Sequence, residues 1–478
     1  MTARAYATFD RLPAQIDEVA RLFVAAGHEI SLVGGPVRDA FLGIEPHDFD
    51  LTTSARPEES ERILQSWTRA TWDMGREFGT IGAERDGVSV EVTTYRADEY
   101  HADSRKPEVA FGDSLEGDLR RRDFTVNAMA LRLPDRTLVD PYGGLSDLLA
   151  GVLRTPISAE VSFEDDPLRI MRAARFAAQL RLDVDEDVLR AMAERAERLR
   201  IVSAERIRAE LERLMVSPAP RRGLELMVHT GVADVVLPEL SALVETHDEH
   251  GRHKDVYEHT LTVLDQAIAL ETDTDGPVPR PDFVLRFAAI MHDVGKPATR
   301  RFEPDGTVSF HHHDIVGAKL TRKRMRALKF DKATTRDVSD LVAMHLRFHG
   351  YGEQGWTDSA VRRYVTDAGE LLERLHRLTR ADVTTRNRRK AERLAHAYDD
   401  LERRIHKLAE QEELAAIRPD LDGNEIMEIL GIGPGREVGA AYKYLLNLRM
   451  ENGPMEPEAA REALLQWWDE HGGGHVQE

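Results

Sequence analysis

The segment from Leu32 to Thr52, LVGGPVRDAFLGIEPHDFDLT, constrains the fold of this 478-residue chain more than any other stretch. The diglycine Gly34-Gly35 ends an apolar run and precedes a proline, which is favoured at the first position of a helix because its missing N–H would be unpaired there. The pattern predicts a short helix over residues 36–42, closed by the glycine that follows. A glycine turn that opens a helix presents unpaired backbone N–H groups, so this turn suits a phosphate group.

Three charged side chains of the same segment extend this prediction. Arg38 lies on the first turn of the expected helix, where it would add a forked pair of donors to the same phosphate. The run Asp48-Phe49-Asp50-Leu51 predicts a strand, in which Asp48 and Asp50 point the same way. Adjacent carboxylates repel each other unless a cation lies between them, and hard oxygen ligands beside a phosphate favour Mg²⁺. Two such ions form the clamp that phosphoryl transfer uses.

The order GG-x-VRD-x-x-LG followed by D-x-D resembles the first motif of the tRNA nucleotidyltransferases that build the 3′ CCA end, and of the related bacterial poly(A) polymerases. Both belong to the polymerase-β-type nucleotidyltransferases. In the predicted strand 88–94, Glu91 lies on the same face as Ser89 and Thr93. This position fits an ordinary solvent-exposed residue and a third metal-binding carboxylate equally well. The resemblance implies that Glu91 joins Asp48 and Asp50 at the metal site.

A second motif follows at residues 121–130, RRDFTVNAMA. It is similar to the family's second motif nearly residue for residue. The resemblance implies that Arg122, Asp123 and Asn127 serve triphosphate binding and ribose recognition, with Gly34 and Gly35 beside them.

A row of arginines follows an acidic residue at 166–175. Asp166 is the predicted cap of a helix that begins at residue 167, and Arg169, Arg172 and Arg175 form a row along one side. A solvated charged face is one interpretation of this row. The other follows from hydrogen-bond chemistry, since a carboxylate only accepts and a guanidinium only donates. Such a pair matches the Watson–Crick edges of cytosine and adenine and opposes those of uracil and guanine.

This helix resembles the family's E-D-x-x-R motif. The resemblance implies that Asp166 and Arg169 pair with the base, and that Arg172 and Arg175 face the nucleotide or its phosphates.

A second constellation of histidines and aspartates lies further along the chain. Its members are His259, His292, Asp293, His313, His345 and Asp382. Imidazoles and carboxylates without thiols suit one or two divalent metals. The run HDVGKP resembles the HD phosphohydrolase superfamily, which implies phosphatase or cyclic-phosphodiesterase activity as a hypothesis. Within the triple histidine of residues 311–313, His313 is the chosen ligand, although the sequence alone does not separate it from His312.

Composition limits the remaining possibilities. The chain has no cysteine, which excludes disulfides, cysteine-bound zinc and thiol catalysis. It has no run of about 18 apolar residues and no signal leader, so a cytoplasmic protein without a membrane anchor is expected. The net charge of −20 argues only mildly against nucleic acid as a partner. The basic runs at 319–329 and 380–390 fit solvated helix faces, and they are also the best local candidates for contact with an RNA backbone.

These observations predict an α+β protein with a helical remainder. We expect a nucleotidyltransferase head with a small mixed sheet at 1–155, a neck with the base-reading helix at 156–240, and an HD-type helical domain at 241–415. A helical tail at 416–478 follows, and its run LDGNEIMEILGIGPGREVGAAYKYL resembles the tail of CCA enzymes that contacts tRNA.

The expected reaction is attack of the tRNA 3′-hydroxyl on the α-phosphate of CTP or ATP, with Mg²⁺ in the head. The sequence leaves alternatives open: a poly(A) polymerase, an enzyme that adds only CC or only A, a protein uridylyltransferase, and an HD nucleotide phosphohydrolase. The predicted base-reading pair opposes UTP and so argues against the uridylyltransferase. Oligomeric state and the identity of the HD metal are not predicted.

Overall fold

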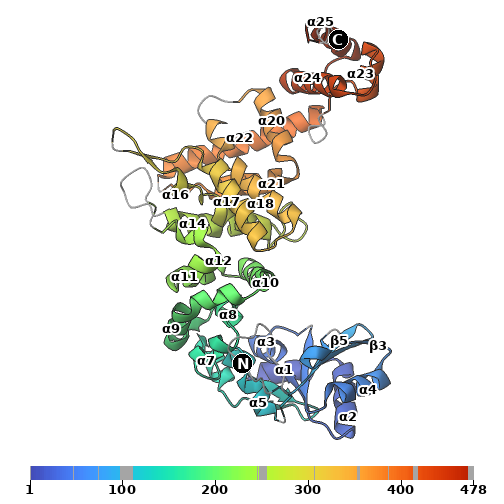
Figure 1. Ribbon diagram of the computed structural model, residues 1–478, viewed down its shortest axis with the longest axis vertical. Helices are drawn as coiled ribbons and strands as arrows, with labels where there is room; N and C mark the ends of the chain where they lie inside the picture. The colour runs from blue at the N-terminus through green and yellow to red at the C-terminus, as the bar shows by residue number, and fades with distance from the viewer. Residues whose placement is uncertain are drawn as a thin grey trace. The chain divides into compact units, whose positions relative to one another are not determined.

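The computed structural model describes the chain in several stretches (Figure 1). These are residues 2–46, 48–73, 75–96, 111–112, 114–244, 246, 256–305, 307–351, 356–385, 387–412 and 418–471. Two compact units emerge, one formed by residues 1–241 with 327–329 and the other by residues 242–326 with 330–478. Each unit is described by itself.

The head of the first unit is built on a mixed sheet with the strand order β3-β4-β5-β2-β1-β6-β7. The strands are β1 (Ile30–Val33), β2 (Phe49–Thr53), β3 (Ala70–Trp72), β4 (Thr80–Arg85), β5 (Val88–Thr94), β6 (Ala130–Arg132) and β7 (Thr137–Val139). Strands β2 and β5 run parallel, and every other neighbouring pair is antiparallel. The predicted small mixed sheet is therefore confirmed, and its only parallel pair carries the predicted acidic residues.

Six helices accompany the described part of this sheet. They are α1 (Thr2–Phe9), α2 (Ala14–Ala25), α3 (Gly35–Leu42), α4 (Pro57–Trp67), α5 (Leu115–Arg120) and α6 (Gly144–Ala150). The predicted short helix after the diglycine is confirmed as α3, which ends at a left-handed Gly43. Helix α1 was not expected from the sequence. Its buried Phe9 packs edge-on against Phe41 of α3 at 5.9 Å, so tertiary packing stabilises a helix too short to form alone.

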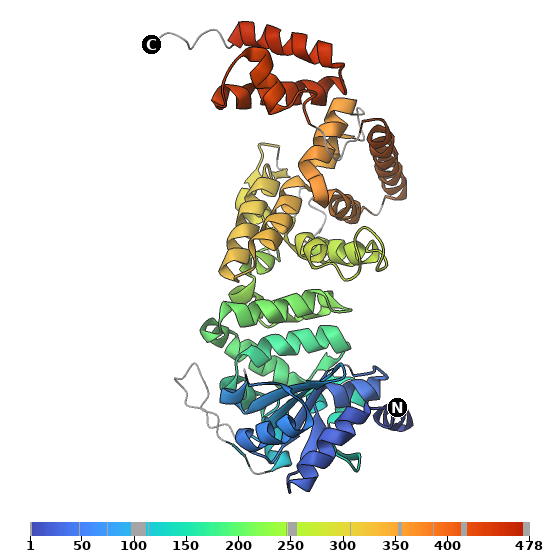
Figure 2. The ribbon, with the colours of Figure 1, turned by 90° about the vertical axis from the view of Figure 1, so that its right-hand side faces the viewer.

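The neck continues the first unit with helices and a short strand pair. Its elements are α7 (Ala159–Asp165), α8 (Leu168–Leu180), α9 (Glu186–Arg195), α10 (Ala204–Met215), α11 (Pro220–His229), α12 (Val232–Val236) and α13 (Pro238–Ser241), with β8 (Val152–Leu153) parallel to β9 (Asp183–Val184). Helix α8 packs against both α10 and α11, which are drawn in green in Figure 2. Ser203 caps α10 by accepting the N–H of Arg206, as the sequence around the cap suggests.

The second unit is helical. Its helices are α14 (Val256–Ala269), α15 (Phe283–Met291), α16 (Lys296–Thr299), α17 (His313–Ala327), α18 (Lys332–Met344), α20 (Asp358–Ala368), α21 (Leu372–Ala381) and α22 (Arg388–Glu412), and the hairpin β10 (Arg301–Phe302) and β11 (Val308–Ser309) lies among them. Helix α15 packs against α14, α18 and α21, and its residues 285–291 are all buried. An almost wholly apolar sequence is what a central helix of such a bundle requires.

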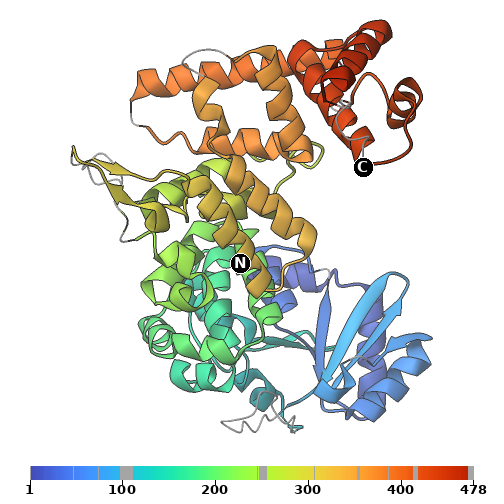
Figure 3. The same ribbon diagram turned by 45° about the horizontal axis from the view of Figure 1, so that its top comes forward.

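The tail forms its own small core within the second unit (Figure 3). Its helices are α23 (Gly423–Leu430), α24 (Arg436–Asn452) and α25 (Pro457–His471). Asp422 and Glu425 form a capping box at the start of α23. Ile426, Ala441 and Leu464 belong to one buried cluster that joins the three helices. An α+β head followed by a mostly helical remainder is thus the architecture of the described chain.

Candidate functional site

The acidic residues of the head lie on the parallel strand pair. Asp50 of β2 is paired in register with Glu91 of β5, both side chains are exposed, and Asp48 lies immediately before β2. Desolvation raises the pKa of Asp50, Arg122 lowers it, and the negative charges of Glu91 and Asp48 raise it. The net pKa lies above its ordinary value chiefly because of desolvation, and the repulsion from Glu91 and Asp48 is a smaller contribution that a bound cation would relieve.

The diglycine lies against the second motif. Gly34 caps α3 with a positive φ of 72° and donates its N–H to the carbonyl of Met129 at 3.2 Å. A Cβ atom on Gly34 would lie 3.0 Å from a terminal nitrogen of Arg122. Only glycine combines this backbone conformation with so close an approach. The structure thus brings the predicted phosphate turn and the predicted triphosphate-binding arginine together.

A chain of polar contacts runs from the head into the neck. Arg38 is buried and donates to the amide oxygen of Asn127 at 2.5 Å, and the amide of Asn127 donates to Asp123 at 3.0 Å. Arg172 of α8 donates from Nε to the other oxygen of Asp123 at 2.7 Å. Burial raises the pKa of Asp123, but Arg172 and Asn127 lower it to about 2. Arg38 therefore braces the second motif in this state, where the sequence predicted a direct phosphate contact.

A buried glutamate anchors the arginine row. Glu210 of α10 accepts from Nε of Arg175 at 2.5 Å and lies 3.6 Å from Arg172. The guanidinium of Arg175 also donates to Gln179 and lies 3.9 Å from the ring centre of Phe176. Arg175 is 6% exposed, so it holds a supporting position within the neck. This placement differs from the expected one, in which Arg175 faces the nucleotide, because α10 supplies a carboxylate that the local sequence does not reveal.

The predicted base-reading pair is engaged within the protein. Helix α8 begins one residue later than predicted, and its first residue, Leu168, donates its N–H to Asp166 at 3.1 Å. The other carboxylate oxygen of Asp166 accepts from Arg206 at 3.0 Å. Arg169 is buried and donates to Ser162 and to the carbonyl of Arg121. Both side chains are therefore held in fixed orientations at the junction of head and neck.

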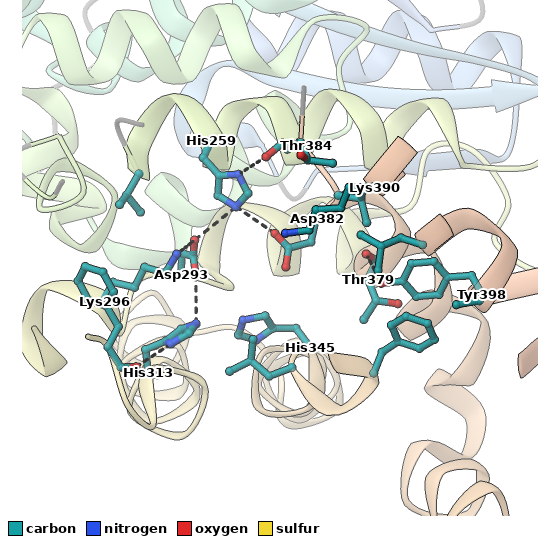
Figure 4. Close-up of a pocket in the computed structure, with 18 of the residues that line it drawn as sticks. His259, Asp293, Lys296, His313, His345, Thr379, Asp382, Thr384, Lys390 and Tyr398 are labelled. Atoms are coloured by element: carbon teal, nitrogen blue, oxygen red, sulfur yellow. Dashed lines mark hydrogen bonds and ion pairs between the residues drawn. The ribbon is translucent and has the colours of Figure 1, made fainter. Parts of the chain in front are cut away.

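The histidines and aspartates of the second unit converge on one point (Figure 4). They form two groups of three whose ligand atoms lie within 4.8 Å of one another, His259 with His292 and Asp382, and Asp293 with His313 and His345. The six residues come from the first turn of α14, the end of α15, the start of α17, the end of α18 and the residue after α21. All six residues singled out in the sequence are thus brought together.

Unsatisfied buried atoms at this point fit divalent metals. Within the described chain, the Nε2 atoms of His292, His313 and His345 are buried without a hydrogen-bond partner, and the first two lie 3.2 to 3.6 Å from carboxylate oxygens of Asp293 and Asp382. Burial lowers the pKa of His292, but Asp293 and Asp382 raise it to about 10. Buried polar atoms without partners cost free energy, and a set of imidazoles and carboxylates is the donor set that divalent transition metals prefer.

The backbone separates the neighbouring histidines at 312 and 313. His312 has a φ of 62° and belongs to neither metal-ligand group of the described residues, whereas His313 contributes to one of them. Gly295 makes this arrangement possible, because a Cβ atom there would lie 2.0 Å from the carbonyl oxygen of His313. The glycine of the HDVGKP motif thus leaves room for the backbone at the start of α17, which carries His313.

A cavity of about 890 Å³ opens over the cluster, a volume within the range of small-molecule pockets. Its charged side chains are basic except for Asp293 and Asp382, which belong to the ligand groups. The basic residues of its lining are His259, Lys296, His311, His312, His313, His345, Lys390 and Arg393. In a chain with a net charge of −20, such a lining favours an anionic ligand.

Several residues at the two sites were missed in the sequence. Glu210 and Arg206 lie on α10, which the sequence shows only as an amphipathic helix. Lys296 of the HDVGKP motif lies 2.8 Å from Asp293, and its place three residues after that aspartate was a usable signal. Thr384 contacts His259 and has no sequence signal beyond its nearness to Asp382.

Known proteins resemble the chain in sequence along its length. Sequence profiles match at residues 30–154 for the poly A polymerase head domain, at 181–243 for the probable RNA and SrmB binding site of polymerase A, and at 256–387 for the HD domain. An A-adding tRNA nucleotidyltransferase of Deinococcus radiodurans is 35% identical over 453 residues, which cover 92% of this chain and 96% of that protein. The chain belongs to the tRNA nucleotidyltransferase family.

Other family members share parts of the sequence or the fold. A CCA-adding enzyme of Streptococcus gordonii is 41% identical over 235 residues, which cover 48% of this chain and 57% of that protein. The crystal structure of the Bacillus stearothermophilus CCA-adding enzyme in complex with CTP has the same fold, with a TM-score of 0.68 and 23% identity over 96% of this chain and 98% of that one. This chain is therefore a nucleotidyltransferase of that family with a fused HD domain. No helix among its described residues is long and apolar enough to cross a membrane.

Proposed function

We propose that this chain adds CMP and AMP from CTP and ATP to the 3′ end of tRNA without a nucleic-acid template. The single observation that carries the proposal is the register of Asp50 beside Glu91, next to the Gly34 turn and Arg122. This register supports a cation site beside a phosphate site at one end of the central strands. The activity named for the Streptococcus gordonii relative supports the choice of both nucleotides.

The head supplies the groups that nucleotidyl transfer needs. Asp48 and Asp50, with Glu91 beside them, would hold Mg²⁺, which lowers the pKa of an attacking hydroxyl and neutralises the triphosphate when bound. The N–H of Gly35 and the guanidinium of Arg122 bind and orient the triphosphate. Asp123 and Asn127 are locked together and to Arg172, so they present a fixed surface to the sugar.

Base selection follows from the fixed orientation of Asp166 and Arg169. Each carboxylate oxygen has two acceptor sites, so Asp166 accepts from a base amino group while it keeps Arg206 and Leu168. A guanidinium has five N–H donors, and Arg169 uses three hydrogen bonds on Ser162 and Arg121. The remaining donors suit the ring nitrogen of cytosine or adenine. Uracil presents a carbonyl and an N–H in the reverse order and is rejected.

A second candidate is addition of AMP alone to tRNA that already ends in CC. The Deinococcus radiodurans relative, 96% of which is covered by the match, is named for A addition to tRNA. The test uses tRNA that lacks its end, tRNA ending in C and tRNA ending in CC, each incubated with CTP, with ATP and with both. Synthesis of CCA on the first substrate supports the proposal. AMP addition to the third substrate alone supports the second candidate, and long A tails contradict both.

We also propose that the HD domain holds two divalent metals and hydrolyses phosphate esters of nucleotides. One ion is assigned to His259, His292 and Asp382, and the other to Asp293, His313 and His345. The basic lining of the cavity and its volume suit a phosphorylated nucleotide. Metal-dependent release of phosphate from 2′-nucleotides, or opening of 2′,3′-cyclic nucleotides, tests this proposal. Activity that persists in an Asp293→Ala variant would contradict it.

A further inference from the structure

Three of the four histidines in the metal-ligand groups are oriented in the same way. Nδ1 of His292, His313 and His345 faces the backbone carbonyl three residues earlier, at 2.7, 2.8 and 2.6 Å. Each carbonyl accepts only, so Nδ1 carries a proton, and Nε2 is the nitrogen that remains to bind a metal once it has no proton of its own. The local backbone therefore sets the tautomer of these three residues without help from another segment.

His259 is oriented differently. It lies in the first turn of α14, and its Nδ1 faces the hydroxyl oxygen of Thr384 at 2.9 Å. Its Nε2 lies 2.9 Å from Asp382 and 3.5 Å from Asp293. The partner of its Nδ1 is thus a side chain from a segment 125 positions away in the sequence (Figure 4).

We propose that Thr384 is a positioning residue for the metal centre, which accepts the Nδ1 proton of His259 and leaves Nε2 free to bind an ion. This inference rests on the proposed metal centre of the HD domain. Partners of this kind fix the ring orientation of a metal-binding histidine, and their loss typically lowers metal affinity by about 10- to 100-fold.

The position of Thr384 makes the effect local. Thr384 follows Asp382 by two residues, so one short segment supplies a ligand and also orients another ligand on α14. Both ligands belong to the group that includes His292, whereas Nδ1 of His313 and of His345 in the other group each face a carbonyl of their own local backbone. Loss of the hydroxyl therefore weakens one metal position and spares the other.

The test is Mn²⁺ binding to the full chain, measured from the free-ion signal in electron paramagnetic resonance. Every protein in the series carries Asp48→Ala and Asp50→Ala, so that the head does not contribute metal sites. Thr384→Val removes the hydroxyl and keeps the shape of the side chain. We expect one class of Mn²⁺ site to weaken about 10- to 100-fold, the other class to keep its affinity, and Thr384→Ser to restore the first.

The matched control is Thr385→Val. Thr385 lines the same cavity, lies in the same segment, and its hydroxyl oxygen accepts only the N–H of Asn387 at 3.3 Å among the contacts described. It should bind Mn²⁺ as the parent does. Melting of each variant without metal shows whether the fold is intact.

Three results overturn the inference. They are unchanged Mn²⁺ binding in Thr384→Val, equal weakening of both classes of site, and an equal effect of Thr385→Val. A different result is expected if the HD domain has no metal centre. In that case His292→Ala binds as much Mn²⁺ as the parent protein does. In that case the proposed HD function falls together with the role of Thr384.

Discussion

Replacement of Asp166 by asparagine gives the sharpest test of base selection. The proposed rejection of UTP rests on two acceptors facing each other, a carboxylate oxygen of Asp166 and the O4 carbonyl of uracil. An asparagine amide turns its N–H₂ group toward O4 and removes that clash, while it presents its oxygen to the amino group of cytosine in the other orientation. We expect Asp166→Asn to incorporate UMP.

The structure sets the size of the effect. A buried acceptor without a donor costs about 1–3 kcal/mol, so the preference for CTP over UTP should fall by about 5- to 150-fold. Folding should change little. Asparagine caps a helix as well as aspartate does, so the contact with the N–H of Leu168 remains. The ion pair with Arg206 joins side chains that are 53% and 27% exposed and contributes only about 0–1 kcal/mol.

The assay compares kcat/KM for CTP and UTP on tRNA that lacks its end. Glu164→Gln is the matched control, because it makes the same chemical change two residues earlier, in α7, at a carboxylate paired with Arg195 and Arg198. An Asp166→Asn enzyme that keeps the parent ratio of CTP to UTP would refute the reasoning. So would an equal loss of selectivity in Glu164→Gln.

Four further predictions concern charge and metal. Asp50→Asn should lower nucleotide incorporation by about a thousandfold or more, since the metal clamp supplies several kcal/mol, and primer extension within tenfold of the parent would contradict this. Glu210→Gln leaves the buried guanidinium of Arg175 without its carboxylate and should destabilise the first unit by about 3–5 kcal/mol in urea unfolding; a loss below about 1 kcal/mol would speak against a buried ion pair. The pKa of Asp123 is about 2 in the folded chain against 3.8 unperturbed, so its contribution of about 2 kcal/mol is present above pH 3.8 and is lost as the pH falls toward 2. The stability gap between the parent and Asp123→Asn, measured by urea unfolding, should therefore narrow in that window and not above it. Removal of HD metals by a chelator, or His292→Ala, should abolish phosphate release and leave incorporation with added Mg²⁺ unchanged; a parallel loss of both activities would contradict separate sites.

Local patterns were sufficient to predict much of the fold. The helix expected at 36–42 and the strand expected at 88–94 are α3 (Gly35–Leu42) and β5 (Val88–Thr94), because a proline after a glycine turn marks a helix start and alternating apolar residues mark a strand. Helix α1 was missed because its stability depends on the contact between Phe9 and Phe41, which no local pattern reveals.

The sites divide in the same way. The six HD residues were found because histidine and aspartate are recognisable as metal ligands from their residue type alone. The pairing of Asp50 with Glu91 in the sheet agrees with the alternation of side chains expected for these strands. The partners that orient those residues were not found. Glu210 meets Arg175 across 35 positions of sequence, and Thr384 meets His259 across 125. A glutamate on an amphipathic helix and a threonine in a loop belong to no sequence motif, so only the folded structure shows which side chains they contact.

The buried contacts that link Asn127, Asp123, Arg172, Glu210 and Arg175 have a practical consequence for chimeric enzymes. A hybrid joined between the head and α10 would inherit some of these charges from one parent and some from the other, and an unmatched charge would be stranded in the interior. Grafts that exchange residues 1–215 as one block keep every partner. Swaps of this nucleotidyltransferase with its relatives should therefore be cut after α10, even though the sheet itself ends much earlier.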